Sequence, residues 1–186
     1  VDDFFQTGRT LTNNVALLGS NQNGDFRLSY TGLDQTGIVP NTDLRRNTIS
    51  FGGGYNLTKK FTARAFVSYI KSESDNRPSI SYGTENIMYL FNCWLPRSVD
   101  VSDMQDYWMR GLEGRRQFGF NYNYHDNPWF TMYENTNGQY VDRIIGNIAL
   151  KYDFTPELSL MLRTATDFAN ERRQYRRAFS TQRFPF

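Results

Sequence analysis

Six segments of this chain alternate between apolar and polar residues with a period of two, and this pattern restricts its fold more than any other feature. In the third segment, for example, Phe51 and Tyr55 fall on the apolar side and Ser50 on the polar side. Successive side chains of a β-strand point to opposite faces, so each segment is predicted to be a strand with one apolar and one polar face. The segments cover about residues 11–20, 25–33, 46–57, 60–72, 142–154 and 157–170.

The connections between these strands are alternately short and long. Three are tight, at residues 20–24, 56–60 and 153–157, and the first and last carry the turn-forming residues Asn, Gly, Asp and Pro. The links at residues 34–44 and 73–141 are long, and a further stretch follows residue 171. In an up-and-down sheet, successive connections lie at opposite ends of the strands, so the short turns are expected at one rim and the long loops at the other. This asymmetry is typical of bacterial outer-membrane barrels.

Aromatic residues mark both ends of the predicted strands. The eight steps from Phe61 to Tyr69 span roughly 27 Å at about 3.3 Å each, which is roughly 20 Å of height at a tilt of about 40°. That height is close to the ~25 Å apolar band of a membrane barrel. The chain is therefore predicted to be all-β, an antiparallel up-and-down transmembrane barrel of about six strands with long outer loops. The aromatic residues are Tyr55, Phe61, Tyr152 and Phe154 beside the short turns, and Tyr30, Tyr69 and Phe168 near the opposite ends.

A soluble antiparallel β-sandwich is the alternative that the alternation leaves open. Strands of about 10–13 residues exceed the usual soluble length of about 5–6 and favour the barrel. Charged residues on the polar faces fit both a wet lumen and a solvent-exposed surface. Burial of Phe51, Leu150 and Leu160 between two stacked sheets would identify the sandwich. The charged residues are Arg27, Arg64, Lys151 and Arg163.

Composition removes several other classes of protein. The 186 residues are 39% apolar and 16% aromatic, a profile that suits strands, turns and polar lumens. A formal net charge of +2 is too small to indicate a general nucleic-acid binder. Cys93 is the only cysteine, which excludes an intrachain disulfide and a cysteine zinc cluster. No apolar run is long enough for a transmembrane helix, whereas membrane-spanning strands keep the mean hydropathy low.

Catalytic and metal-binding motifs are missing from the sequence. His125 is the only histidine, so paired-histidine metal sites are excluded, and no nucleophile elbow, P-loop or dinucleotide motif occurs. Glycines 52–54 lie inside a predicted strand, where they are expected to mark a bend, a bulge or a close approach. The acidic residues Asp100 and Asp103 lack calcium-loop spacing. The sequence therefore predicts no enzyme, no cofactor and no metal site.

Nearly half of the aromatic residues lie in the long loop at residues 73–141, which is therefore expected to be packed. Thr84 is a candidate cap for a short helix that ends near Trp94. Ser102 with Gln105 is a candidate capping box for a second helix around residues 103–109.

Two groups of residues are candidates for binding. Aromatic rings stack on sugars and their polar edges bind peptides, although packing within the loop is the alternative for each ring. The first group is Trp94, Tyr107, Trp108, Trp129 and Tyr133. Arginine forks bind phosphate in two-point contacts, so a basic cluster after the sixth strand could hold lipopolysaccharide head groups, with pairing to acidic loop residues as the alternative. This second group is Arg172, Arg173, Arg176 and Arg177.

The stretches that carry the predicted strands and turns also resemble a known family. They read FRLSYTGLDQTGIVPNTDLRRNTISFGGGYNLTKKFT, SDNRPSISYGTENIMYLFNCWLPRSVD, HDNPWFTMYENTN, RIIGNIALKYDFTPELSLMLRTATDF and RRAFSTQRFP, and together they cover most of residues 25–185. In these blocks the chain resembles the SusC/RagA family of TonB-dependent outer-membrane transporters from Bacteroidetes. The first residues, VDDFFQTGRTLTNNVALLG, look like that family's passage from plug into barrel.

The resemblance implies an internal fragment of a larger plugged barrel of about 22 strands. Residues 1–10 would be the plug-to-barrel passage, and residues 11–186 would be a partial barrel with an outer loop at about 73–141. About six strands cannot close such a barrel, and an open sheet edge is unfavourable in lipid, so further strands are expected.

The resemblance also implies a function, namely import of oligosaccharides or peptides across the cell outer membrane. A SusD-like surface lipoprotein would be a partner, and TonB, contacted through segments outside this chain, would supply the force. The chain itself would contact outer-membrane lipid and perform no bond chemistry. A passive porin-like barrel and a soluble carbohydrate-binding β-sandwich are the alternatives. The cargo stays open, because glycan and peptide importers of this family share these blocks.

Overall fold

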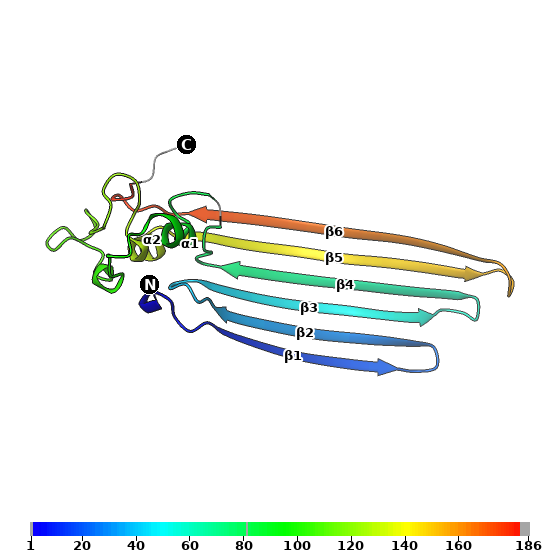
Figure 1. Ribbon diagram of the computed structural model, residues 1–186. Coiled ribbons are helices and arrows are strands. Elements are labelled where there is room, and N and C mark those ends of the chain that lie inside the picture. The colour runs from blue at the N-terminus through cyan, green and yellow to red at the C-terminus, as the bar shows by residue number, and fades with distance from the viewer. Residues whose placement is uncertain (1, 81, 183–186) are drawn as a thin grey trace.

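The computed structural model describes residues 2–80 and 82–182 and contains one six-stranded sheet (Figure 1). The strands follow one another in the order β1 to β6, and every neighbouring pair is antiparallel. The all-β, up-and-down architecture predicted from the sequence is thus confirmed as a single open sheet. The strands are β1 (Arg9–Ser20), β2 (Gly24–Thr36), β3 (Asp43–Asn56), β4 (Phe61–Ser74), β5 (Asn137–Asp153) and β6 (Ser159–Tyr175).

The connections divide between the two ends of the sheet as predicted (Figure 1). Residues 21–23, 57–60 and 154–158 form short turns at one end, and residues 37–42 and 75–136 connect strands at the other. In each short turn one side chain, that of Asn21, Thr58 or Thr155, accepts hydrogen bonds from the backbone N–H groups two and three residues later. These side-chain bonds hold the tight geometry that the turn sequences predicted.

The strands extend further towards the long-loop end than predicted. The link expected at residues 34–44 is only residues 37–42, because Asp34 still pairs with Arg45 and Thr36 with Asp43. Likewise β5 begins at Asn137 and β6 ends at Tyr175. In these extensions both faces of the strands are largely polar, so apolar alternation stops although the backbone ladder continues. The expected long link at residues 34–44 was therefore wrong in length.

All five strand pairings run without an inserted residue, so the described sheet contains no bulge. The glycine run at residues 52–54 instead allows side chains of β4 to approach the backbone of β3. A Cβ on Gly54 would lie 2.8 Å from Cγ of Arg64, and one on Gly52 would lie 3.4 Å from the ring of Phe66. Of the three roles expected for these glycines, close approach is the one observed.

The buried apolar core lies at the long-loop end and not on the sheet. Residues 75–80 and 82–136 fold into a compact cap, which we call the loop unit, and Phe4 from the segment before β1 packs into it. Phe51, Leu150 and Leu160 are between 38% and 52% exposed, and no second sheet covers them in the described part of the chain. The buried core residues are Phe4, Val39, Ile87, Leu90, Val101, Met104, Trp129 and Met132.

The helices of the loop unit differ from those predicted. Helix α1 (Ile87–Tyr89), continued by the π-helix η2 (Leu90–Trp94), is capped by Asn86 and not by Thr84. The second predicted helix shrinks to the 3-10 turn η3 (Ser102–Met104), because the Ser102 hydroxyl donates to Asp100 and does not cap a helix.

Helix α2 (Pro128–Glu134) was not predicted. Its signal was present in the sequence, since Asn127 caps it and Pro128 occupies its first turn. Within residues 2–80 and 82–182, no helix has the length and apolar content needed to cross a membrane.

The predicted division at residue 10 falls close to the start of β1 at Arg9. Ahead of it, the 3-10 turn η1 (Asp2–Phe4) lies at the long-loop end of the sheet (Figure 1). Val1 and residues 183–186, which the division also includes, lie outside the described residues.

Candidate functional site

The unbroken register gives the sheet one apolar and one polar face, because directly opposite residues share a face. On the apolar face a row of large side chains, which includes Tyr30 and Tyr69, crosses the sheet near the long-loop end. Their hydroxyls donate to Asn47 and Asp142, which begin the polar zone beyond it. This row contains Val15, Tyr30, Ile49, Tyr69, Ile144 and Phe168.

The other aromatic row lies at the short-turn end of the same face. Phe61 is directly opposite Tyr152, with 6.3 Å between the ring centroids, and the ring of Phe154 lies 4.8 Å from that of Tyr152. The apolar face is thus a band closed at both ends by aromatic residues.

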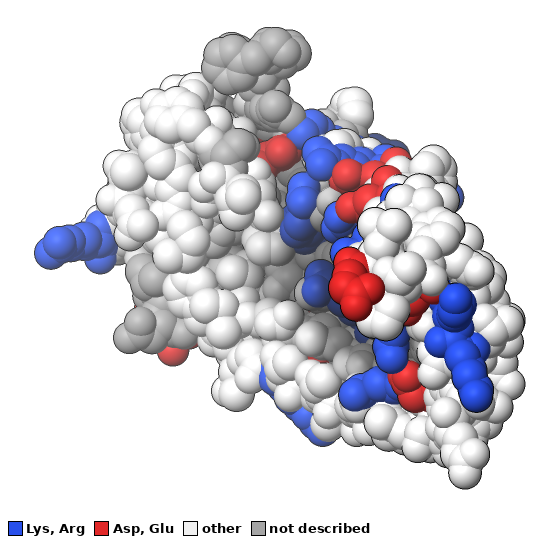
Figure 2. Space-filling view, turned by 90° about the vertical axis from the view of Figure 1, so that its right-hand side faces the viewer, with Lys and Arg blue, Asp and Glu red and all other residues white. Residues whose placement is uncertain are grey.

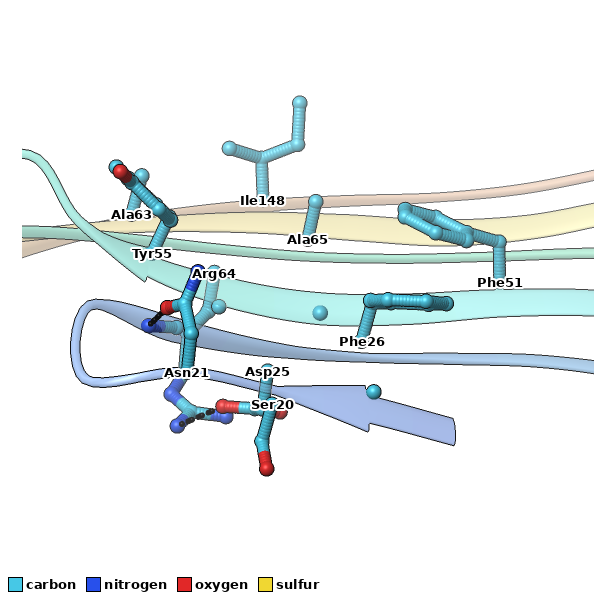
Figure 3. A pocket seen from close by; sticks show the side chains of 14 residues that line it. Ser20, Asn21, Asp25, Phe26, Phe51, Tyr55, Ala63, Arg64, Ala65 and Ile148 are labelled. Atoms are coloured by element: carbon cyan, nitrogen blue, oxygen red, sulfur yellow. Dashed lines mark hydrogen bonds and ion pairs between the residues drawn. The ribbon is translucent and has the colours of Figure 1, made fainter. Parts of the chain in front are cut away.

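A shallow groove lies towards the short-turn end of this band, on β1 to β5 (Figure 3). Phe26, Phe51 and Ile148 project to one side of the sheet, whereas Arg64 and Asp25 project to the other and form an ion pair of 3.1 Å. The groove has a volume of about 610 Å³. It forms where glycines and alanines, whose side chains are small, lie between the large side chains. Its lining is mainly apolar and offers few groups for polar recognition.

The polar face carries most of the charge (Figure 2). Viewed along the strands from the short-turn end, Lys, Arg, Asp and Glu side chains gather around a hollow on the inner side of a curved wall. By register, cations outnumber anions on this face of the strands. The cations are Arg27, Arg46, Arg64, Arg143, Lys151, Arg163 and Arg173, and the anions are Asp25, Asp153, Asp167 and Glu171.

A second hollow, of about 680 Å³, lies on the polar face next to the loop unit. Arg46, Arg77 and Arg143 line it from β3, from the start of the loop unit and from β5. Arg143 forms a two-point ion pair with Asp167 of β6. Arg77 donates to Oε1 of Gln139 at 2.7 Å. We call this second hollow the arginine hollow.

The five aromatic candidates do not share one site. Trp129 is 8% exposed, and its indole N–H donates to the carbonyl oxygen of Val101 at 2.9 Å, so it belongs to the core of the loop unit. Trp108 packs its ring 5.3 Å from that of Phe130. For these two tryptophans the structure shows the packing alternative.

Tyr107 and Tyr133 lie together, with nearly parallel rings 6.2 Å apart. The Tyr107 hydroxyl donates to Glu134 at 3.1 Å. Burial, together with this bond, raises the pKa of Tyr107, which keeps the phenol neutral. Tyr133 is exposed and stands beside Trp129, so it is the accessible member of this stack.

Trp94 lies elsewhere in the loop unit, exposed on one side and 5.1 Å from the ring of His125 on the other. His125 is fully buried between Trp94 and Tyr124, and neither ring nitrogen has a hydrogen-bond partner among the described residues. Burial lowers the pKa of His125. His125 is thus part of the packed interior of the loop unit.

Next to it, Asn127 joins the parts of the loop unit. Its amide N–H₂ donates to the carbonyl oxygens of Met104 and Phe118, while its Oδ1 caps α2. The neighbouring Asp126 accepts from Gln117 at 2.6 Å, and burial raises the pKa of Asp126. These contacts are structural, and no described His, Cys, Asp and Glu side chains gather in threes as a metal site.

The predicted basic cluster is divided by the strand geometry. Arg172 lies on the apolar side of β6 over the ring of Tyr140, at 4.7 Å, whereas Arg173 points to the polar side and pairs with Glu171. Arg177 pairs with Glu85 at 2.7 Å. The fourth member, Arg176, follows the end of β6. Alternation along a strand separates neighbours that look like a cluster in the sequence.

Sequence reasoning missed the arginine hollow. Arg46 lies on the polar face of β3, just before its apolar residues begin, so the alternation could have indicated that its side chain faces the hollow. Nothing in the sequence indicated that Arg77, from the loop, would lie beside it.

The fold defines an all-β protein with a two-faced open sheet and a packed cap on its long loops. No protein-family model matches the chain, and no curated protein matches it at a significant level. The resemblance to the SusC/RagA family therefore stays a prediction.

Proposed function

We propose that this chain forms part of the wall and the outer loops of a TonB-dependent importer that moves oligosaccharides or peptides across the outer membrane. The observation that carries the proposal is the apolar band on one face of the sheet, bordered by aromatic rows, opposite a charged face. Hydrocarbon covers such a band without further protein, and a water-filled lumen solvates the charges.

The free edges of the sheet add a second argument. β1 and β6 each pair on one side only within the described residues. Unpaired backbone groups are costly in lipid, so the proposal requires further strands to close the barrel. The importer class itself rests on the resemblance to the SusC/RagA family, which also supplies the SusD-like lipoprotein and TonB as partners.

Paired cysteine variants on β5 test the membrane placement. In the full-length protein with Cys93→Ser, we expect a water-soluble maleimide to label Asn147→Cys but not Ile148→Cys in intact outer membranes. Both should react after denaturation. These neighbours point to opposite faces of one strand. Equal labelling of the two in intact membranes would contradict a lipid-facing band, as would recovery of the protein in plain buffer without detergent.

Uptake measurements test the importer class. Cells that carry the full-length protein should take up labelled oligosaccharides or peptides, and the uptake should cease when TonB is removed. Uptake that continues without TonB would instead identify a passive, porin-like barrel.

A further inference from the structure

We propose that the arginine hollow binds an anionic group of the cargo, such as the carboxylate of a uronic-acid oligosaccharide or of an acidic peptide. The inference rests on the proposed function in treating the ligand as transported cargo, although binding itself does not require transport. The hollow lies on the charged face beside the loop unit, and its volume of about 680 Å³ falls within the usual range for ligand sites of about 300–1,000 Å³.

Two of the three arginines have no carboxylate partner. No direct ion pair joins Arg46 or Arg77 to any described Asp or Glu, and the guanidinium of Arg77 donates to the neutral amide of Gln139. Arg143, by contrast, is neutralised by Asp167. Glu171 attracts Arg77 at longer range, but its direct ion pair is with Arg173, so the hollow keeps an excess of positive charge.

The one acidic residue of the lining, Asp43, is already engaged. Its carboxylate accepts from the backbone N–H groups of Asp75 and Asn76 at 2.9 and 3.3 Å and lies 3.9 Å from Arg45. By register Asp43 shares a face of β3 with Arg45 and not with Arg46, so its negative charge is directed towards Arg45.

A buried hydroxyl supplies an independent sign of a ligand. Ser74, which is 6% exposed, lines the hollow, and its Oγ has no hydrogen-bond partner among the described residues. Buried polar atoms in proteins nearly always have a hydrogen-bond partner, and an oxygen of a bound group would supply the partner that the Ser74 hydroxyl lacks. Ser72, Gln35 and Gln139 place further polar groups around the same space.

The chemistry of these groups selects the ligand class. A guanidinium presents a planar fork of N–H donors that matches the two oxygens of a carboxylate, and Arg143 of the lining already makes such a contact with Asp167 of β6. A neutral sugar or amide would leave Arg46 and Arg77 without a direct carboxylate partner. The structure thus favours a charged cargo over a neutral one of the same size.

Binding of four probes to the full-length protein in outer-membrane vesicles tests the proposal. Tetragalacturonate and tetraglutamate carry carboxylates on a sugar and on a peptide backbone, and methyl-esterified tetragalacturonate and tetraglutamine are their neutral counterparts. At least one anionic probe should bind more tightly than its neutral counterpart, and the preference should weaken as salt is added. Which anionic probe binds identifies the source of the carboxylate.

Variants locate the binding. Arg46→Gln and Arg77→Gln should each weaken binding of the anionic probe about tenfold and leave the neutral probe unchanged. Arg27→Gln, a cation on the same face outside the hollow, is the matched control and should change little. Arg46→Lys, which keeps the charge but not the fork, should fall between. Equal amounts of each variant in the outer membrane exclude a folding defect.

The outcomes separate this inference from the proposed function. Equal binding of anionic and neutral probes, no binding of either anionic probe, or equal effects of Arg27→Gln and Arg46→Gln overturns the anionic site, even where TonB-dependent uptake of neutral cargo is found. Anionic binding that depends on Arg46 and Arg77 without TonB-dependent uptake supports the site and contradicts the importer.

Discussion

The ring of Phe4 packs edge-on against the ring of Trp129, with 4.8 Å between the two centroids. One residue precedes the first strand and the other lies in α2 of the long loop. The contact joins the segment before β1 to the loop unit, and both rings are buried in its core. Trp129 is therefore expected to act through packing and not through direct contact with a ligand.

Removal of the Phe4 ring should loosen the loop unit. Phe4→Ala is expected to cost about 3–5 kcal/mol of its stability, because the ring is fully buried against Phe91 and Trp129. Limited proteolysis of the full-length protein in membranes should then cleave residues 75–136 faster. Phe179→Ala, which removes the same ring from a site that is 90% exposed, should have no such effect.

Charge on the apolar face should carry a cost that depends on depth. Ile148 lies midway between the two aromatic rows, so Ile148→Arg should cost about 2–4 kcal/mol in lipid. Leu160 is directly opposite Tyr152 and so belongs to the short-turn row. Leu160→Arg should therefore cost only about 0–1 kcal/mol.

Unfolding of the full-length protein in lipid vesicles measures these differences. Asn147→Arg, next to Ile148 but on the polar face, is the matched control and should be mild. Similar costs for Asn147→Arg and Ile148→Arg would refute the assignment of faces.

Gly54 should resist substitution because of Arg64. A Cβ at this position would lie 2.8 Å from Cγ of Arg64, so Gly54→Ala should displace that side chain, disturb its ion pair with Asp25 and cost about 1–3 kcal/mol. In the Arg64→Ala background the same change should cost much less. A double-mutant cycle of unfolding free energies checks this, and additive costs would show that the two residues are independent.

Acidification should weaken the loop unit through His125. Burial lowers the pKa of this residue below its ordinary 6.5, so the unfolded loop binds a proton more readily than the folded one. Stability is therefore lost as the pH falls below about 6.5 and until it passes the lower pKa of the folded state. Proteolysis of residues 75–136 should therefore accelerate as the pH is lowered from about 8 to about 5, and His125→Phe should remove that acceleration.

The neighbouring Asp126 acts with the opposite sign. Burial raises its pKa, so the folded loop holds this proton more tightly and gains stability from it as the pH falls. Asp126→Asn should therefore make the acid sensitivity steeper. A shallower response in that variant would contradict the assignment of the two groups.

The sequence predicted closely those parts of the fold that depend on interactions between near neighbours in the chain. The alternation that places Phe51 and Ile148 on one face is local, and so are the turns closed by Asn21 and Thr155. The strand ends were missed, because backbone pairing continues beyond the apolar band without any apolar alternation to report it. The loop helices were missed in detail, because tertiary hydrogen bonds such as those of Asn127 decide where they begin.

The candidate site shows the same division. Single residues such as Trp94 and Arg172 were selected by their chemistry, yet the structure places Trp129 in the core, Tyr133 in a stack with Tyr107, and Trp94 elsewhere in the loop unit. It also brings together Arg46 and Arg77, which no sequence pattern connects.

By itself the sequence determined that this chain forms long two-faced strands joined by alternating short and long connections, because side-chain alternation and turn chemistry act between near neighbours. Only the tertiary structure decided that the long loop folds into a packed cap and that two arginines without acidic partners line one hollow. Those features depend on contacts between residues far apart in the chain, and local periodicity carries no record of such contacts.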